Sequence, residues 1–101
     1  PDVYLVNVGE LAESAAFATA ECLRNAGVQV VLHAGGGSFK SQMKKADRSM
    51  ARYALILGDD EVNNRQVTLK PMQGDAQPES KPEQVQCSIE QAINIIMAGN
   101  N

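Results

Sequence analysis

The sequence contains few of the residues that build catalytic or metal centres. Among its 101 residues there are one histidine, two cysteines and no tryptophan. Cys22 and Cys87 are far apart, so the closely spaced ligand pairs of a zinc site are missing and a disulfide framework is not expected. Both cysteines are expected to be reduced packing residues in a cytoplasmic protein.

Long apolar runs are also missing. No apolar stretch approaches the roughly 20 residues that span a bilayer, and a hydrophobic fraction of 44% beside 21% charged residues is typical of a globular protein. The length suits one small domain, residues 1–101, rather than an enzyme with separate cofactor and substrate lobes. Because the chain begins at Pro1 without methionine, we expect a piece of a longer protein.

Basic residues are outnumbered overall but concentrated in one segment. Nine Lys and Arg residues stand against 12 Asp and Glu residues, a net charge of -3. Residues 33–52 nevertheless carry five bases and one acid, whereas residues 1–32 carry one base and four acids. An acidic chain with one basic patch is not a general nucleic-acid coat, but it can present a local docking site for phosphates.

The apolar pattern alternates between strand and helix. Residues 3–8 form an apolar run with one polar interruption, which is typical of a strand buried on both faces, and residues 28–33 and 53–57 are the next two predicted strands. A polar turn then leads to an antiparallel strand at residues 66–70, and Ser88 begins a final amphipathic helix. The order predicts a three-layer α/β domain with a mixed, mostly parallel sheet of about five strands and three helices. The proline-rich segment 71–83 is expected to be a flexible surface loop.

A glycine-rich turn and a basic helix follow the second predicted strand, in "VVLHAGGGSFKSQMKKADRSMARYALILGDDE". Backbone amides at such a helix start can meet an anion. The apolar residues of the helix recur at core spacing: Phe39, Met43, Ala46 and Met50. Bases four residues apart form a ridge of like charge: Lys40, Lys44, Arg48 and Arg52. This combination predicts a phosphate-docking site.

The stretch "GDDEVNNRQVTLK", Gly58 to Lys70, gathers carboxylates, amides and a guanidinium at the end of a strand. Carboxylates accept hydrogen bonds from base amino groups, and the other groups offer donors to base edges. The turn could therefore read splayed-out bases, or be a polar hairpin turn with no ligand. A paired-carboxylate hydrolase is disfavoured because no second acidic cluster or histidine opposes it. His33, at a strand end, is expected to be a structural hydrogen-bonding residue.

The stretches "DVYLVNVGE", "HAGGGSFKSQMKKADRSMARYALILGDDEV" and "VTLK" resemble, in this order and spacing, the C-terminal anticodon-binding domain of bacterial histidyl-tRNA synthetases. The resemblance implies that this chain holds the anticodon arm of the tRNA, with no catalytic residue and no cofactor of its own. It implies that the missing N-terminal catalytic domain of a homodimeric parent activates histidine with ATP and Mg²⁺. The fragment by itself could then be monomeric.

The sequence departs from this family at several positions. The family usually has glycine where this chain has Met50 and Arg65, and its "KDL" is "KPM" here. Met50 fits the predicted core spacing, whereas Arg65 occupies a turn expected to favour a positive φ. The family's Gly-Glu-Gln turn is replaced by the longer loop, so its counterpart could be Gln77 or Gln84.

The resemblance also carries over site residues by position. It implies that the anticodon loop is shaped or contacted by Gly36, Gly37, Phe39 and Lys40. The anticodon bases would unstack over the sheet end formed by this turn and the Gly58–Glu61 turn. For Phe39 the helical spacing favours packing in the core over base stacking.

The other expected RNA contacts lie outside the glycine turn. By resemblance, Glu61 accepts a hydrogen bond from a base, and Lys70 meets a base or a phosphate. Lys44 and Arg48 are phosphate positions because of the charge ridge more than because of the family.

Two other functions stay open at this point. The first is a small nucleotide- or effector-binding domain of flavodoxin-like type, which predicts binding of a mononucleotide without RNA. Its motifs are weak, because the three glycines are contiguous and neither G-x-G-x-x-G nor G-x-x-x-x-G-K-[ST] is present. The second is a protein-interaction module of a synthetase-like regulator, which predicts a protein partner and no discrimination between anticodons.

Overall fold

The computed structural model describes residues 1–72 and 84–98. Its elements in chain order are β1 (Val3–Val8), α1 (Glu10–Asn25), β2 (Val30–Leu32), α2 (Phe39–Arg48), β3 (Tyr53–Gly58), α3 (Asp59–Asn63), β4 (Val67–Pro71), β5 (Val85–Cys87) and α4 (Ile89–Ala98). The strands form one sheet in the order β2-β1-β3-β4-β5. Strands β2, β1 and β3 are parallel, while β4 and β5 add antiparallel pairs. The predicted α/β fold with a mixed sheet is confirmed.

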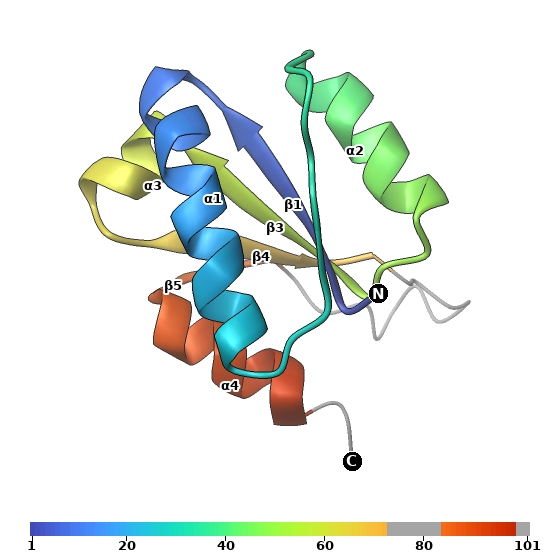
Figure 1. Ribbon diagram of the computed structural model, residues 1–101, viewed down its shortest axis with the longest axis vertical. Coiled ribbons are helices and arrows are strands. Elements are labelled where there is room, and N and C mark those ends of the chain that lie inside the picture. Colours follow the sequence, from blue (N-terminus) through green and yellow to red (C-terminus); the bar gives the residue numbers. More distant parts are fainter. Residues whose placement is uncertain (73–83, 99–101) are drawn as a thin grey trace.

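Helices cover both faces of the sheet: α1 and α4 pack on one face and α2 on the other (Figure 1). Strand β1 has a strand on each side and helices over both faces, which explains why its sequence is apolar except at Asn7. Val3 and Leu5 point into the larger cluster under α1 and α4, whereas Tyr4 and Val6 point into the smaller cluster under α2. Successive side chains of a strand alternate between faces, so a strand covered on both sides is apolar at most positions.

The structure has one helix that the sequence did not predict. Residues 59–63, expected to be a tight loop, form the short helix α3 directly after β3. The Glu61 carboxylate accepts a hydrogen bond from the Gly58 N–H at 2.8 Å and so caps the helix start. This is the glutamate half of a capping box, which the acidic sequence of the turn makes available.

The predicted core face of α2 is confirmed at Met43 and Ala46 but wrong at Phe39 and Met50. Gln42 and Ala46 are buried and Met43 is half-buried, but Phe39 is 46% exposed and Met50 is 67% exposed. The reason lies at the two ends of the helix. The Ser38 side chain caps α2 at its start, so Phe39 lies in the first turn, and Met50 lies beyond the last helical residue.

Met50 and Arg65 are the two non-glycine residues with positive φ among those described, at 65° and 56°. Each follows a helix end in the position that favours glycine. After α3 the Schellman pattern is complete, because Arg65 N–H donates to Val62 O at 3.1 Å and Gln66 N–H donates to Glu61 O at 2.8 Å. The expected positive φ at Arg65 is confirmed, whereas the expected core position of Met50 is not.

Most of the predicted loop 71–83 lies outside the described residues. Pro71 ends β4, and Met72 donates its N–H to Arg52 O at 2.8 Å and packs against the smaller cluster. The described helices were also compared with the length and hydropathy of a membrane span, and none of them could cross a bilayer.

Candidate nucleic-acid interface

The glycine loop lies between the end of β2 and the start of α2. Gly35, Gly36 and Gly37 have φ values of 94°, 69° and 102°. A side chain at Gly36 would meet no atom within 4 Å, so steric crowding does not explain the glycine. Glycine adopts such left-handed backbone conformations readily, whereas a residue with a Cβ atom pays about 1–2 kcal/mol at each position. The backbone conformation therefore accounts for the run of three.

A buried polar network lies beneath this loop and comprises Tyr4, Asn7, His33 and Gln42. Each of the four is at most 7% exposed. His33 Nε2 faces the carbonyl oxygen of Gly36, and the Tyr4 hydroxyl lies 2.7 Å from His33 Nδ1. A carbonyl oxygen only accepts, so Nε2 carries the hydrogen and a neutral ring then accepts from Tyr4 at Nδ1. His33 is thus a structural hydrogen-bonding residue, as its sequence context predicted.

Gln42 completes the network by replacing a missing strand partner. Pairing of β1 with β2 stops at Leu5, so the peptide groups of Asn7 have no neighbouring strand on that side. The Asn7 N–H donates to Gln42 Oε1 at 3.0 Å, and Gln42 Nε2 donates to Asn7 O at 2.8 Å and to Gly37 O at 3.0 Å. The Gln42 amide therefore supplies the hydrogen bonds that a neighbouring strand would give to Asn7, and it also holds the glycine loop.

Sequence reasoning missed Asn7 and Gln42. Both carried a weak signal, because Asn7 is the one polar residue in an apolar strand and Gln42 lies four residues before the buried Ala46. A buried amide with three backbone partners depends on where β2 stops relative to β1, which no local pattern encodes.

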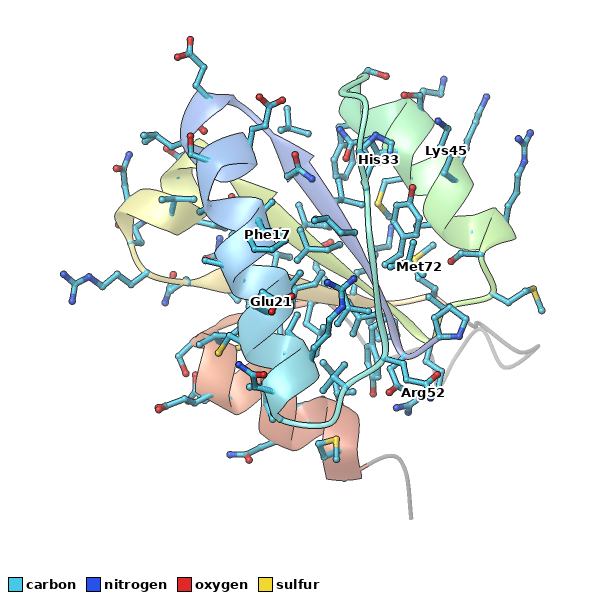
Figure 2. The ribbon with its side chains drawn as sticks, in the orientation of Figure 1. Phe17, Glu21, His33, Lys45, Arg52 and Met72 are labelled. Carbon is cyan, nitrogen blue, oxygen red and sulfur yellow. The ribbon has the colours of Figure 1, made fainter. Side chains whose placement is uncertain are left out.

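Four bases of α2 are exposed: Lys40, Lys44, Lys45 and Arg48. In the described part of the chain, no carboxylate lies within 4.0 Å of their charged groups. We name these four the basic ridge. Figure 2 shows Lys45 on α2, apart from Arg52 near the N-terminal end of the chain. Unpaired cations on one helix create a local positive potential on an otherwise acidic molecule.

Arg52 does not belong to the basic ridge, contrary to the prediction from its spacing. Its guanidinium donates to Asp2 Oδ1 at 3.2 Å and to Ile96 O at 3.1 Å, and it lies 5.5 Å from the centre of the Tyr53 ring. Arg52 follows the end of α2, so the helical spacing no longer sets its direction. It links the N-terminal end of the chain to α4.

A polar cavity of about 470 Å³ lies beside the N-terminal end of α2. It is lined by Phe39, Ile56, Glu61, Thr68, Gln84 and Gln86. The half-exposed ring of Phe39 stands at this cavity rather than in the core, so the expected packing role is wrong. An aromatic face next to amide and carboxylate groups is an arrangement that can stack on a base and hydrogen-bond its edge.

Glu61 has structural partners within this cavity. Its Oε1 atom caps α3 through the Gly58 N–H, and its Oε2 atom accepts from Gln86 Nε2 at 3.3 Å, with Thr68 Oγ1 at 3.5 Å. A Cβ atom at Gly58 would lie 2.5 Å from Glu61 Oε1, so a larger residue there would displace the Glu61 carboxylate. A carboxylate has about four acceptor positions, two on each oxygen. Oε2 already accepts two hydrogen bonds and Oε1 one, so the position left for a donor from a base is on Oε1.

The predicted site residues divide into three groups. Gly36, Gly37, Phe39 and Lys40 lie together at the loop and the start of α2. Glu61 shares the polar cavity with Phe39, while Lys70 is half-buried on β4 opposite Ala54, a residue of the α2 face. Lys44 and Arg48 lie further along the exposed side of α2 and do not line this cavity. All eight are nevertheless on or beside the α2 face of the sheet.

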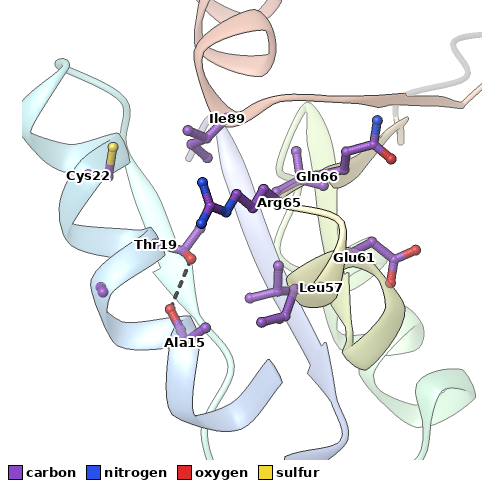
Figure 3. Close-up of a pocket in the computed structure, with 11 residues that line it drawn as sticks. Ala15, Thr19, Cys22, Leu57, Glu61, Arg65, Gln66 and Ile89 are labelled. Carbon is purple, nitrogen blue, oxygen red and sulfur yellow. Dashed lines mark hydrogen bonds between the residues drawn. The ribbon is translucent and has the colours of Figure 1, made fainter. Parts of the chain in front are cut away.

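A second, mostly apolar cavity of about 310 Å³ lies between α1, α3 and the start of α4 (Figure 3). Arg65 extends across it toward Thr19, whose hydroxyl donates to Ala15 O at 2.9 Å. Cys22 lines its edge and is exposed, so the expectation that both cysteines pack in the interior holds only for Cys87. Burial raises the pKa of the Cys87 thiol above its usual value.

The sequence matches the family described as "Anticodon binding domain" over residues 2–98. The chain belongs to this family of anticodon-binding domains. Its curated relatives include the histidine–tRNA ligase of Methylobacillus flagellatus, 57% identical over 95% of this chain, and that of Thiobacillus denitrificans, 57% identical over 76% of it. The chain spans 22% and 18% of these two relatives.

Solved structures share the fold at lower sequence identity. Histidyl-tRNA synthetase from Nostoc sp. PCC 7120 superposes with a TM-score of 0.83 at 23% identity, over 99% of this chain and 22% of that one. The RNA binding domain of threonyl-tRNA synthetase from Cryptosporidium parvum gives 0.81 at 15% identity, over 96% and 23%. The mixed sheet and its helices are thus the fold of synthetase anticodon-binding regions.

Proposed function

We propose that this chain recognises the anticodon arm of histidine tRNA as part of a histidine–tRNA ligase. The observation that carries the proposal is one continuous arrangement on the α2 face. The basic ridge has no carboxylate partners among the described residues, and the exposed Phe39 ring stands beside a cavity with carboxylate and amide groups. Relatives that are histidine–tRNA ligases support this assignment.

The two parts of this surface have different tasks. Lys40, Lys44 and Arg48 bind phosphates of the anticodon arm, which contributes affinity without sequence information. Phe39 stacks on an unstacked base, and Glu61 accepts a hydrogen bond from a base edge at the acceptor position that its internal partners leave free. Lys70 approaches the same face from β4 and binds a base or phosphate. Gly36 and Gly37 let the RNA come close to the backbone.

The chemistry of aminoacylation lies outside this chain in our proposal. ATP and Mg²⁺ would act in the part of the ligase that this chain does not span. That part would also hold the cytoplasmic parent together as a homodimer, and residues 1–101 would form one RNA-binding domain.

The test is a titration of the chain with an anticodon stem-loop of histidine tRNA, beside the same hairpin with its anticodon bases changed. Each is measured at about 50 and 200 mM salt, where phosphate contacts differ strongly in strength. Tighter binding of the unchanged hairpin is expected. Equal binding of both hairpins would leave only a phosphate dock, and binding of a mononucleotide but no hairpin would favour the effector-binding alternative.

A further inference from the structure

The polar network beneath the glycine loop directs two of its donors at the loop's own carbonyl groups. His33 Nε2 donates to Gly36 O and Gln42 Nε2 donates to Gly37 O. The side chains of the network are at least nine-tenths buried, so they are not placed to contact RNA themselves. Any effect that they have on RNA binding must act through the loop.

The carbonyl bonds determine where the next amides point. In a planar trans peptide, the N–H of a residue points opposite to the preceding carbonyl, and no cis peptide is present among the described residues. With the carbonyls of Gly36 and Gly37 held toward the network, the N–H groups of Gly37 and Ser38 point away from it. Both residues are exposed, and neither amide has an acceptor in the part of the chain that the structure describes.

We infer that Tyr4, His33 and Gln42 are positioning residues, which fix these two outward amides for oxygen atoms of the bound anticodon arm. The inference rests on the proposed function and deepens it. A run of three glycines has more accessible conformations than any other tripeptide, and ordering it on binding would reduce affinity. The network removes that cost in advance, and Tyr4 contributes by holding the His33 ring in its donating orientation.

Three substitutions test the network in the 101-residue chain: Tyr4→Phe, His33→Phe and Gln42→Met. Each keeps roughly the volume of the side chain and removes its hydrogen bonds. We expect Gln42→Met to weaken binding of the anticodon hairpin about tenfold and Tyr4→Phe about threefold. Ile96→Val is the matched control, because it lowers stability from the larger cluster on the other face and does not touch the loop.

Two readouts separate positioning from a merely structural role. The first is the ¹H–¹⁵N NOE of Gly36, Gly37 and Ser38 without RNA, which reports fast backbone motion. The second is hairpin affinity, measured well below the melting temperature of every variant. We expect the network variants to lower both the NOE and the affinity, and Ile96→Val to lower neither. Tyr4→Phe decides the question if Gln42→Met does not fold.

The outcomes distinguish this inference from the proposed function. If the wild-type chain binds the hairpin and folded network variants bind it equally well, the positioning role is wrong and the proposed function stands. A fall in affinity with an unchanged NOE also overturns the positioning role. If the wild-type chain binds no hairpin, the proposed function is wrong and the RNA role of the network falls with it.

Discussion

Replacing Lys44 by glutamine should reduce the salt dependence of RNA binding without changing the fold. Lys44 is exposed on the basic ridge and has no carboxylate partner among the described residues. Each phosphate contact contributes about 0.7–0.9 to the slope of log affinity against log salt. If Lys45 contacts a phosphate as the other three ridge bases do, the slope is about -3, and raising salt from about 50 to 200 mM weakens binding about 60-fold.

Removing one of the four contacts lowers that salt effect to about 20-fold. At low salt the loss of affinity should be about fivefold, because two unit charges 4 Å apart in water interact by about 1 kcal/mol. The assay is fluorescence anisotropy of a labelled anticodon hairpin over a salt series. The melting temperature should stay within about one degree, since an exposed side chain without partners contributes little to stability.

Arg24→Gln provides the charge-matched control. Arg24 is on α1, on the other face of the sheet, and pairs with Glu21 at 3.3 Å. The Arg24→Gln substitution changes the net charge by the same amount as Lys44→Gln, but it should leave the slope of log affinity against log salt unchanged. An equal fall in slope for both variants would show that only the total charge matters, and an unchanged slope for Lys44→Gln would remove Lys44 from the interface.

Three further predictions address stability and access. Met50→Gly should stabilise the chain by about 0.5–1 kcal/mol, because relief of a left-handed residue, about 1–2 kcal/mol, exceeds the entropy cost of glycine. Denaturant unfolding measures the change in stability. The control Ser49→Gly, at a residue with φ of -71°, should instead destabilise the chain. Equal changes in the free energy of unfolding for the two variants would show that the positive φ of Met50 is not the cause. Glu61→Ala should cost about 1 kcal/mol through loss of the α3 cap, whereas Glu61→Gln should retain most stability but lose discrimination between hairpins. If a folded Glu61→Gln variant still distinguished the two hairpins, Glu61 would not be the residue that contacts the base. Iodoacetamide should modify exposed Cys22 in the native chain and spare Cys87, whose burial blocks access and raises the thiol pKa. Mass spectrometry of tryptic peptides checks this, and comparable native labelling of Cys87 would show that β5 opens.

Local chemistry in the sequence was enough to predict most of the fold. Apolar runs predicted β1 and β3 within a residue, because a strand buried on both faces is apolar at most positions. Contiguous glycines predicted a turn before a basic helix, and bases four residues apart predicted a ridge of like charge, which is exposed at Lys40, Lys44 and Arg48 but does not include Arg52. Each of these depends on the residue and its near neighbours.

Tertiary structure decided the features that depend on distant segments. Phe39 and Met50 are a local exception, since the Ser38 cap and the end of α2 place both of them at the surface despite their core spacing. Arg52 continues the ridge in sequence, but the carboxylate of Asp2 and the C-terminal end of α4 hold it elsewhere. The Gln42 amide is buried and hydrogen-bonds the end of β1 because β2 stops short of the end of β1. The sequence thus determined which segments are strands, helices and charged faces, while the pairing of segments far apart in the chain decided which polar groups are buried and which remain free to bind.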